Sequence, residues 1–218
     1  AVMERLPHEL LVGAGAARFA SEIGADRDSN LVADSARAWR ELIEREAGPD
    51  AIDRLDDLAL IDLCRAAMDP ERVRDTTVYL AQDAAGGLAS ATSTSGWAWK
   101  YPGRLGDSPI IGAGSYADTA FGAAACTHTG EMTMRAGTAR SIVLYLKMGL
   151  SLRDAVDEAV SDLARLRGGM LAGVVIHAID ASGSAHVVAV NCSNDIRYWI
   201  WTPDMETPEL RSAEHREI

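Results

Sequence analysis

The chain has 218 residues, 48% of them hydrophobic and 24% charged, so it is long enough to bury a sizeable core. Its net charge of -11 and its lack of Lys/Arg runs argue against nucleic acid and anionic membranes as partners. No apolar stretch approaches the roughly 18 residues of a membrane span, so we expect no membrane partner.

The cysteines are scattered along the chain and odd in number, at Cys64, Cys126 and Cys192. They form no spacing typical of a metal site, so we expect neither a metal ion nor a cofactor. Buried free thiols are the expected state. Such thiols indicate a reducing compartment, and we expect a cytoplasmic location.

Patterns in the first 75 residues predict a short strand followed by helices. The strand is expected at Leu10–Val12, and the helices at Gly13–Ile23, Asn30–Ala47 and from Asp50 to about Met68. Residues 71–75 have the composition of an exposed linker.

The next segment predicts a pair of strands and a long loop. Thr76–Gln82 and Leu88–Ser93 alternate like strands, and the glycine-containing stretch between them is typical of a hairpin turn. Residues 95–118 are rich in Gly, Pro, Ser and Asp, which predicts a long ordered loop of the kind that often carries function. A strand of small residues is expected at Phe121–Cys126.

The remaining chain predicts two helices and then a β-meander. One helix is expected at Glu131–Met148, and a second begins at a capping box formed by Ser151 and Asp154. The second helix is expected to bury an apolar stripe, at Leu152, Ala155, Val156, Ala159, Val160 and Leu163. Strands are expected at Leu171–Ile179, Ala185–Val190 and Ile196–Trp201, before a mobile polar tail from Thr202. This order of elements predicts an α+β fold with helices covering one face of a sheet.

A series of motifs follows Asp75-Thr76. They are D-x-x-G-x-L at Asp83–Leu88, T-S-T at Thr92–Thr94, P-G-R-x-G-D-S-P-I at Pro102–Ile110, G-A-G-x-Y-A-D at Gly112–Asp118 and C-T-x-T-G-E at Cys126–Glu131. Their order and spacing resemble the glycosylasparaginase and plant-type asparaginase family. These are N-terminal-nucleophile hydrolases that also include isoaspartyl peptidases.

The resemblance implies a four-layer αββα sandwich. Residues 1–75 would be the end of an α segment with its linker, and residues 76–218 a β segment, the two forming one domain. The family has a longer front than this chain, which begins with Ala1 rather than Met, so we expect the front to be absent here.

Thr76 carries the chemistry in this interpretation. A threonine hydroxyl is a weak nucleophile unless a base lies beside it. Cleavage between Asp75 and Thr76 would give Thr76 an α-amine of pKa about 7.7 to 8.0, which can take the proton of its own hydroxyl. The resemblance implies that the chain makes this cut itself. Taken alone, Thr76 would be an ordinary β-branched strand residue.

Two charged residues in the loop are candidates for substrate binding. The resemblance implies that Arg104 binds the α-carboxylate of an asparagine derivative and that Asp107 binds its ammonium. A guanidinium suits this task because it can donate two parallel hydrogen bonds to one carboxylate. The alternative is that Arg104 and Asp107 pair with each other at a turn.

Further site residues come from the threonine-containing motifs. The resemblance implies that Thr94 steadies the nucleophile, that Thr127 and the following backbone N–H form the oxyanion hole, and that Gly130 admits substrate. The family usually has glycine where this chain has His128 and Val78. The backbone N–H survives the first change, and the imidazole is expected to narrow or tune the substrate site. The alternative is that His128 is an unpaired histidine on the surface.

Two functions follow from these residues. The first is an amidohydrolase that cleaves asparagine, N4-glycosyl-asparagine or β-aspartyl peptides through a β-aspartyl ester of Thr76, as a homo-oligomer of processed units. The second is an uncleaved, catalytically silent homologue with a binding or regulatory role, for which Val78, His128 and the missing front are the motivation.

Overall fold

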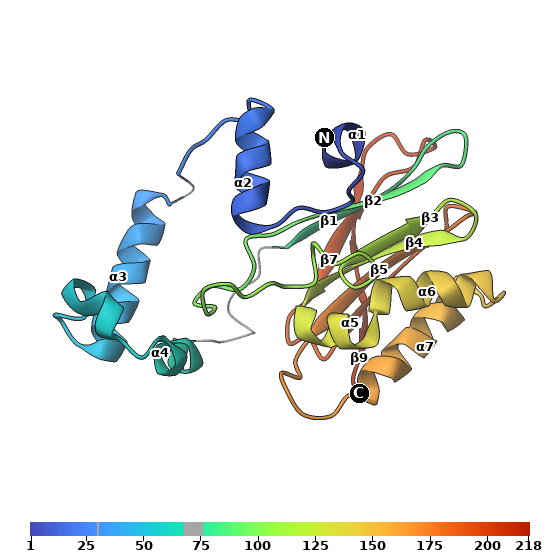
Figure 1. The fold of residues 1–218 in the computed structure, drawn as a ribbon. Helices are drawn as coiled ribbons and strands as arrows, with labels where there is room; N and C mark the ends of the chain where they lie inside the picture. Colours follow the sequence, from blue (N-terminus) through green and yellow to red (C-terminus); the bar gives the residue numbers. More distant parts are fainter. Residues whose placement is uncertain (30, 68–75) are drawn as a thin grey trace. The chain divides into compact units, whose positions relative to one another are not determined.

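The computed structural model describes residues 1–29, 31–67 and 76–218, which fall into two compact units, residues 1–59 and 60–218. The first unit is helical (Figure 1). Its elements are α1 (Val2–Arg5), α2 (Gly13–Glu22), α3 (Ala33–Ala47) and the 3-10 helix η1 (Ile52–Asp57). Leu42 and Ile43 of α3 are its buried apolar side chains, together with Ala51.

Two expectations for this part of the chain are wrong. Leu10–Val12 is not a strand: Leu10 and Val12 are exposed, and no strand among the described residues pairs with this run. The single helix predicted from Asp50 is divided into η1 and α4 (Leu60–Ala67), because Leu58 adopts an extended conformation with ψ 139°. Met68 and the predicted linker at residues 71–75 lie outside the described residues.

A five-stranded sheet organises the second unit. Its order is β3 (Ser115–Asp118), β4 (Gly122–His128), β5 (Val174–Asp180), β6 (Ala185–Val190) and β9 (Glu214–Arg216). The first four strands pair antiparallel, and β9 joins β6 in parallel. Side chains alternate between the two faces of such a sheet, so β4 and β5 present one set of residues to each side.

Helices cover one face of this sheet. Figure 1 shows α5 (Gly130–Ala136), α6 (Thr138–Lys147) and α7 (Leu152–Ala164) gathered on the same side. The predicted apolar stripe of α7 is fully buried there, at Leu152, Ala155, Val156, Ala159, Val160 and Leu163. The predicted cap is also present, since the Ser151 hydroxyl accepts a hydrogen bond from the backbone N–H of Asp154.

The helix predicted at Glu131–Met148 is two helices. Gly137 has φ 59° and ψ 39°, a left-handed conformation that glycine adopts readily, and it separates α5 from α6. The break lets α5 and α6 take different directions while both remain on the helical face of the sheet.

Two hairpins complete the unit. The predicted strand pair is β1 (Thr77–Gln82) with β2 (Leu88–Ser93), and it packs on β3 and β4. The second hairpin pairs β7 (Arg197–Ile200) with β8 (Glu209–Ser212), and Tyr198 packs against a cluster on the sheet face opposite α7.

The predicted meander and mobile tail are therefore wrong. The strand after β6 pairs with β8 instead of β6, and the tail from Thr202 supplies both β8 and β9. The long loop likewise ends in β3, which the sequence did not predict. Helices on one face of the sheet and a hairpin on the other confirm the α+β class.

Candidate active site

The register of the β1–β2 hairpin brings Thr76 and Thr94 together. Thr77 lies opposite Ser93 as the last pair of the ladder, so the next residues outward, Thr76 and Thr94, face each other at the open end. The Thr76 hydroxyl donates a hydrogen bond of 3.1 Å to Oγ1 of Thr94. A slip of one residue would turn these side chains to opposite faces and break the contact.

Both hydroxyls belong to the sheltered face of the hairpin. Thr76, Val78 and Leu80 are half-buried while the residues between them are exposed. On the partner strand, Thr92 and Thr94 are half-buried in the same alternation. Val78, one of the departures from the family pattern, pairs with Thr92 on this face.

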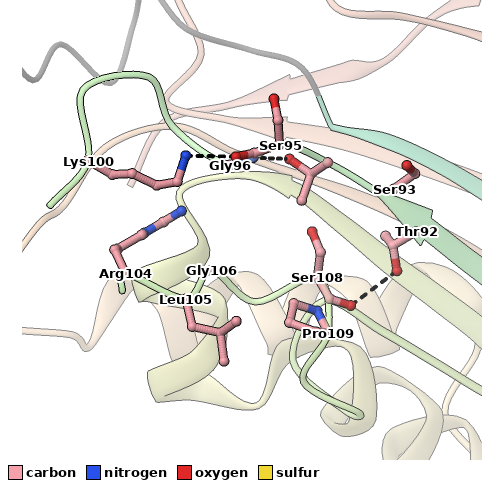
Figure 2. A pocket seen from close by; sticks show the side chains of 11 residues that line it. Thr92, Ser93, Ser95, Gly96, Lys100, Arg104, Leu105, Gly106, Ser108 and Pro109 are labelled. Atoms are coloured by element: carbon pink, nitrogen blue, oxygen red, sulfur yellow. Dashed lines mark hydrogen bonds between the residues drawn. The ribbon is translucent and has the colours of Figure 1, made fainter. Parts of the chain in front are cut away.

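A pocket of about 360 Å³ adjoins this pair (Figure 2). Its walls come from the end of β2 and from the loop that follows, and Thr94 is one of the lining residues. The other polar side chains in the wall are Thr92, Ser93, Ser95, Lys100, Arg104 and Ser108. Thr94 therefore links the Thr76 hydroxyl to a polar pocket, and its Oγ1 also accepts a hydrogen bond of 2.9 Å from the N–H of Gly96.

Arg104 is held in the pocket wall by an ion pair with Glu131. Its Nε and Nη2 donate to the Glu131 carboxylate at 2.8 to 3.0 Å, and the guanidinium lies over the ring of buried Trp97 at 4.7 Å. The Arg104 side chain is 16% exposed and that of Glu131 29% exposed, so the ion pair is largely shielded from solvent. The alternative suggested by the sequence, a pair between Arg104 and Asp107, is therefore wrong. Arg104 bonds to Glu131, and Asp107 bonds to Thr133.

Glycines leave room for the guanidinium. A Cβ at Gly106 would lie 2.9 Å from Nη1 of Arg104, and a Cβ at Gly96 would lie 3.3 Å from the same atom. Gly96 also has φ 76°, a conformation that side chains rarely adopt. The glycines of this loop are therefore part of the pocket wall, because they set how closely Arg104 can approach the backbone.

Asp107 lies under α5. Its carboxylate accepts a 2.6 Å hydrogen bond from Thr133 in that helix, and the residue is 6% exposed. Burial raises the pKa of Asp107, while the Thr133 hydrogen bond and the charge of Arg104 oppose that rise. A Cβ at Gly130 would lie 2.7 Å from Oδ1 of Asp107, so Gly130 makes room for this carboxylate.

Thr127 and His128 end β4. Thr127 is buried, and its Oγ1 lies 2.8 Å from Nδ1 of His128. His128 has φ 80°, the left-handed region where a side chain is strained and glycine is not. This backbone conformation explains why glycine suits this position, and the imidazole occupies the space beside the Thr127 hydroxyl.

His177 sits on the neighbouring strand β5, opposite Ala125. Burial lowers the pKa of His177 to about 4, and the nearby His128 contributes to the same shift. His177 is therefore neutral at physiological pH, as a half-buried polar residue of the sheet.

The described part of the chain contains no group of His, Cys, Asp and Glu side chains that could hold a metal ion. Within those same residues, no helix has the length and apolar character needed to cross a membrane.

Comparison with known proteins shows the family to which the chain belongs. A family model described as Asparaginase matches residues 1–210. The chain belongs to this asparaginase family. Membership confirms the resemblance inferred from the motifs and assigns the chain to the N-terminal-nucleophile hydrolases, in agreement with the α+β architecture.

Similar proteins carry three kinds of name. The chain is 38% identical to an isoaspartyl peptidase of Salmonella typhimurium, an alignment covering 95% of this chain and 62% of that protein. It is 34% identical to the N(4)-(Beta-N-acetylglucosaminyl)-L-asparaginase of Elizabethkingia miricola, over 76% of this chain and 44% of that protein. It is 32% identical to a plant-type L-asparaginase of Pyrococcus horikoshii, over 95% of this chain and 65% of that protein. The chain thus spans less than two thirds of these asparaginase-family relatives.

The predicted site residues of this asparaginase-family chain fall into local groups. Thr76 and Thr94 bond to each other, Thr94 and Arg104 line one pocket, Asp107 meets Gly130, and Thr127 meets His128. Asp75 lies outside the described residues.

Sequence reasoning missed the partners that hold these groups. Glu131 holds Arg104 and Thr133 holds Asp107, and both partners are in α5. The glutamate ends the C-T-x-T-G-E motif, so its place in that motif was the available signal.

Proposed function

We propose that this chain belongs to an N-terminal-threonine amidohydrolase. Its substrates would be asparagine, N4-glycosyl-asparagine or β-aspartyl peptides, which share an aspartyl group with a side-chain amide. The observation that carries the proposal is the hydrogen bond between the Thr76 and Thr94 hydroxyls beside a polar pocket. The names of the similar proteins agree with this substrate class.

Maturation is the first step of the proposed mechanism. The Thr76 hydroxyl attacks the carbonyl carbon of Asp75, the peptide becomes an ester, and water opens the ester. Asp75 accepts the hydroxyl proton while no free amine exists, and this proton passes to the Thr76 nitrogen as the peptide C–N bond breaks. The products are a chain that ends in the carboxylate of Asp75 and a chain that begins with the α-amine of Thr76.

Hydrolysis uses the same hydroxyl. The Thr76 α-amine takes the hydroxyl proton, and Oγ1 attacks the side-chain amide carbon of the substrate. The nitrogen of the substrate amide takes this proton and leaves as an amine when its C–N bond breaks. A β-aspartyl ester of Thr76 remains until water releases aspartate. Thr94 positions the nucleophile, since its Oγ1 is fixed by the Gly96 N–H and is itself the acceptor for Thr76.

The remaining residues hold substrate and developing charge. Arg104 binds the α-carboxylate and Asp107 the ammonium, while Thr127 and the His128 N–H stabilise the oxyanion. One oxyanion donor is typically worth about 2.7 to 4 kcal/mol of transition-state stabilisation. His128 and Gly130 bound the substrate site, since each governs the space around a neighbouring functional group.

Intact mass tests the proposal directly. The protein carrying this chain is expressed, denatured and weighed, and a new chain that begins at Thr76 is the expected product. Thr76→Ala is expected to abolish both cleavage and hydrolysis, because one hydroxyl serves both, while Thr76→Ser retains part of each. A Thr76→Ala protein that still matured at this bond would disprove the assignment of the nucleophile.

One observation favours a second candidate, a catalytically silent homologue with a binding or regulatory role. The Thr127 hydroxyl is engaged by His128, whose side chain stands where the family usually has none. In that case the wild-type protein would stay uncut and would hydrolyse none of the three substrates, although the folded unit would be intact.

Assembly and location are part of the same proposal. We propose a homo-oligomer of processed units, to be tested by light scattering of the mature protein. Cys64, Cys126 and Cys192 are free thiols, which supports a reducing compartment such as the cytoplasm. Of these, Cys126 is buried as expected, whereas Cys64 and Cys192 are only half-buried. Fractionation of cells expressing the protein at its natural level tests that placement.

A further inference from the structure

Two cations meet at Gly96 in the pocket wall. A Cβ at Gly96 would lie 3.3 Å from Nη1 of Arg104 and 3.4 Å from Cε of Lys100, so both side chains pass close to this glycine. Figure 2 shows both directed toward the turn at Ser95 and Gly96. Both residues also line the pocket, so an anion entering it would meet two positive side chains.

Arg104 has only part of its donor capacity available. Its Nε and Nη2 are used by Glu131, and that carboxylate also offsets the charge of the guanidinium. No hydrogen bond within the described residues uses Nη1, the nitrogen that lies beside Gly96. One of the two edges through which a guanidinium can bind a carboxylate with parallel hydrogen bonds is therefore occupied, and Nη1 is the nitrogen left to face the pocket.

Lys100 has the complementary properties. Its Nζ donates to the backbone carbonyls of Ser95 at 2.8 Å and Trp97 at 3.0 Å, which fixes the position of the ammonium. An ammonium has three donors, so one remains for a ligand. Across the described ranges, no carboxylate lies within ion-pair distance of Lys100, so its charge is not offset as that of Arg104 is.

We propose that Lys100 is a substrate-binding residue that shares the α-carboxylate of the substrate with Arg104. The free donor of Nζ binds one carboxylate oxygen and Nη1 of Arg104 binds the other, on either side of Gly96. This assignment rests on the proposed amidohydrolase function, because it concerns the carboxylate of that substrate. It also explains why glycine occupies position 96, apart from its φ of 76°. Any side chain at this position would stand between the two donors.

Lys100 also supports the turn that positions Thr94, so a test has to separate the two roles. The turn carries the Gly96 N–H that bonds Thr94, and it is the turn to which Nζ donates. Loss of turn support would impair every substrate, whereas loss of the anion site would impair only substrates with a free α-carboxylate. Asparagine and asparagine α-amide are the matched pair that distinguishes these outcomes.

The experiment compares Lys100→Gln with Lys147→Gln in the mature enzyme. Gln keeps a hydrogen-bond donor but removes the charge, and Lys147 is an exposed lysine of α6 that lies over Phe121. For Lys100→Gln, KM for asparagine is expected to rise about tenfold to a hundredfold, as for the loss of one charged hydrogen bond, with a smaller change in kcat. KM for the α-amide is expected to stay within about twofold. Lys100→Arg should restore part of the loss, and Lys147→Gln should match the wild type.

Three outcomes would overturn the inference. Equal losses on asparagine and its α-amide would make Lys100 a support of the turn. Unchanged kinetics on both would make it a bystander. A loss confined to β-aspartyl dipeptides, absent with asparagine, would assign Lys100 to the carboxylate of the leaving amino acid.

The proposed function can fail separately. A wild-type protein that hydrolyses none of these substrates would refute the amidohydrolase, and L-aspartate binding, measured by calorimetry, would then decide the anion site alone. Weaker binding to Lys100→Gln than to Lys147→Gln would support that site, and equal binding would refute it.

Discussion

Arg104 binds Glu131 through parallel hydrogen bonds from Nε and Nη2, and this pair fixes the guanidinium on the pocket wall. We predict that Arg104→Lys raises KM for asparagine about tenfold to a hundredfold, since a lysine keeps the charge but loses the planar fork. Arg135→Lys is the control, because Arg135 donates to backbone carbonyls of the 167–168 turn. Equal wild-type kinetics on asparagine and its α-amide would remove the basis for this role.

Thr94 offers a sharper test of the nucleophile pair. Thr94→Val keeps the shape of the side chain but removes the acceptor for the Thr76 hydroxyl and the Gly96 N–H. We predict that kcat falls about tenfold to a hundredfold with a smaller change in KM. Thr92→Val is the matched control, since its hydroxyl bonds to Ser108 and Ser115 instead. Equal losses in the two variants would mean that the hairpin end is only structural.

We expect Asp107 to lower the free energy of unfolding at neutral pH, although we propose that it binds the substrate ammonium. Burial raises its pKa, so the folded state holds the proton more firmly than the unfolded state. This contribution favours folding in acid and is lost as pH rises through the unfolded and then the raised folded pKa. We predict that Asp107→Asn unfolds at higher urea than wild type at pH 7, that the advantage disappears in acid, and that kcat/KM falls about thirtyfold or more. Lower stability of the variant at pH 7 would contradict this account.

His128 combines a strained backbone with a side chain that engages Thr127. Glycine at this position would relieve strain of about 1 to 2 kcal/mol, partly offset by the greater freedom of glycine in the unfolded chain. We predict that His128→Gly is no less stable than wild type and gains activity on N4-glycosyl-asparagine relative to asparagine. His128→Asn, which tolerates φ 80° but keeps a polar side chain, should lie between them. An unchanged substrate ratio in both variants would make His128 a bystander.

We predict that the protonation of His177 lowers the stability of the protein in mild acid. Its pKa of about 4 in the folded protein lies below the unfolded value of about 6.5, so folding favours the neutral ring. This stability is fully present above pH 6.5 and is lost as pH falls from 6.5 towards 4, by about 3 kcal/mol. Urea unfolding across this range should show a weaker pH dependence for His177→Gln than for wild type. The exposed His215→Gln should behave as wild type does, and identical slopes in all three proteins would refute the prediction.

Local patterns predicted the parts of the structure that depend on neighbouring residues. The hairpin register follows from its alternation and turn, and it places Thr76 opposite Thr94. The apolar stripe and the Ser151 cap likewise fixed α7 in advance. These signals succeed because each pairing or face is set within a few residues of sequence.

Long-range pairings were beyond such reasoning. The parallel joining of β9 to β6 spans the whole β7–β8 hairpin, and nothing in a polar tail distinguishes an edge strand from a loop. The partner of Arg104 is 27 residues away in α5, so its identity depended on how the helix packs. Gly137 was visible in the sequence, but only its left-handed conformation shows that it divides the helix.

The ladder of β1 begins at Thr77, immediately after Thr76. Chain ends usually fray, because nothing restrains their first residues. A terminus created at Thr76 would instead be anchored from the moment it formed, with one residue beyond a paired strand and its hydroxyl already bonded across the hairpin. The segment before Thr76 could then move away after cleavage without displacing the reactive residue. Residues of the hairpin would position Thr76, and residues before it would be needed only for cleavage.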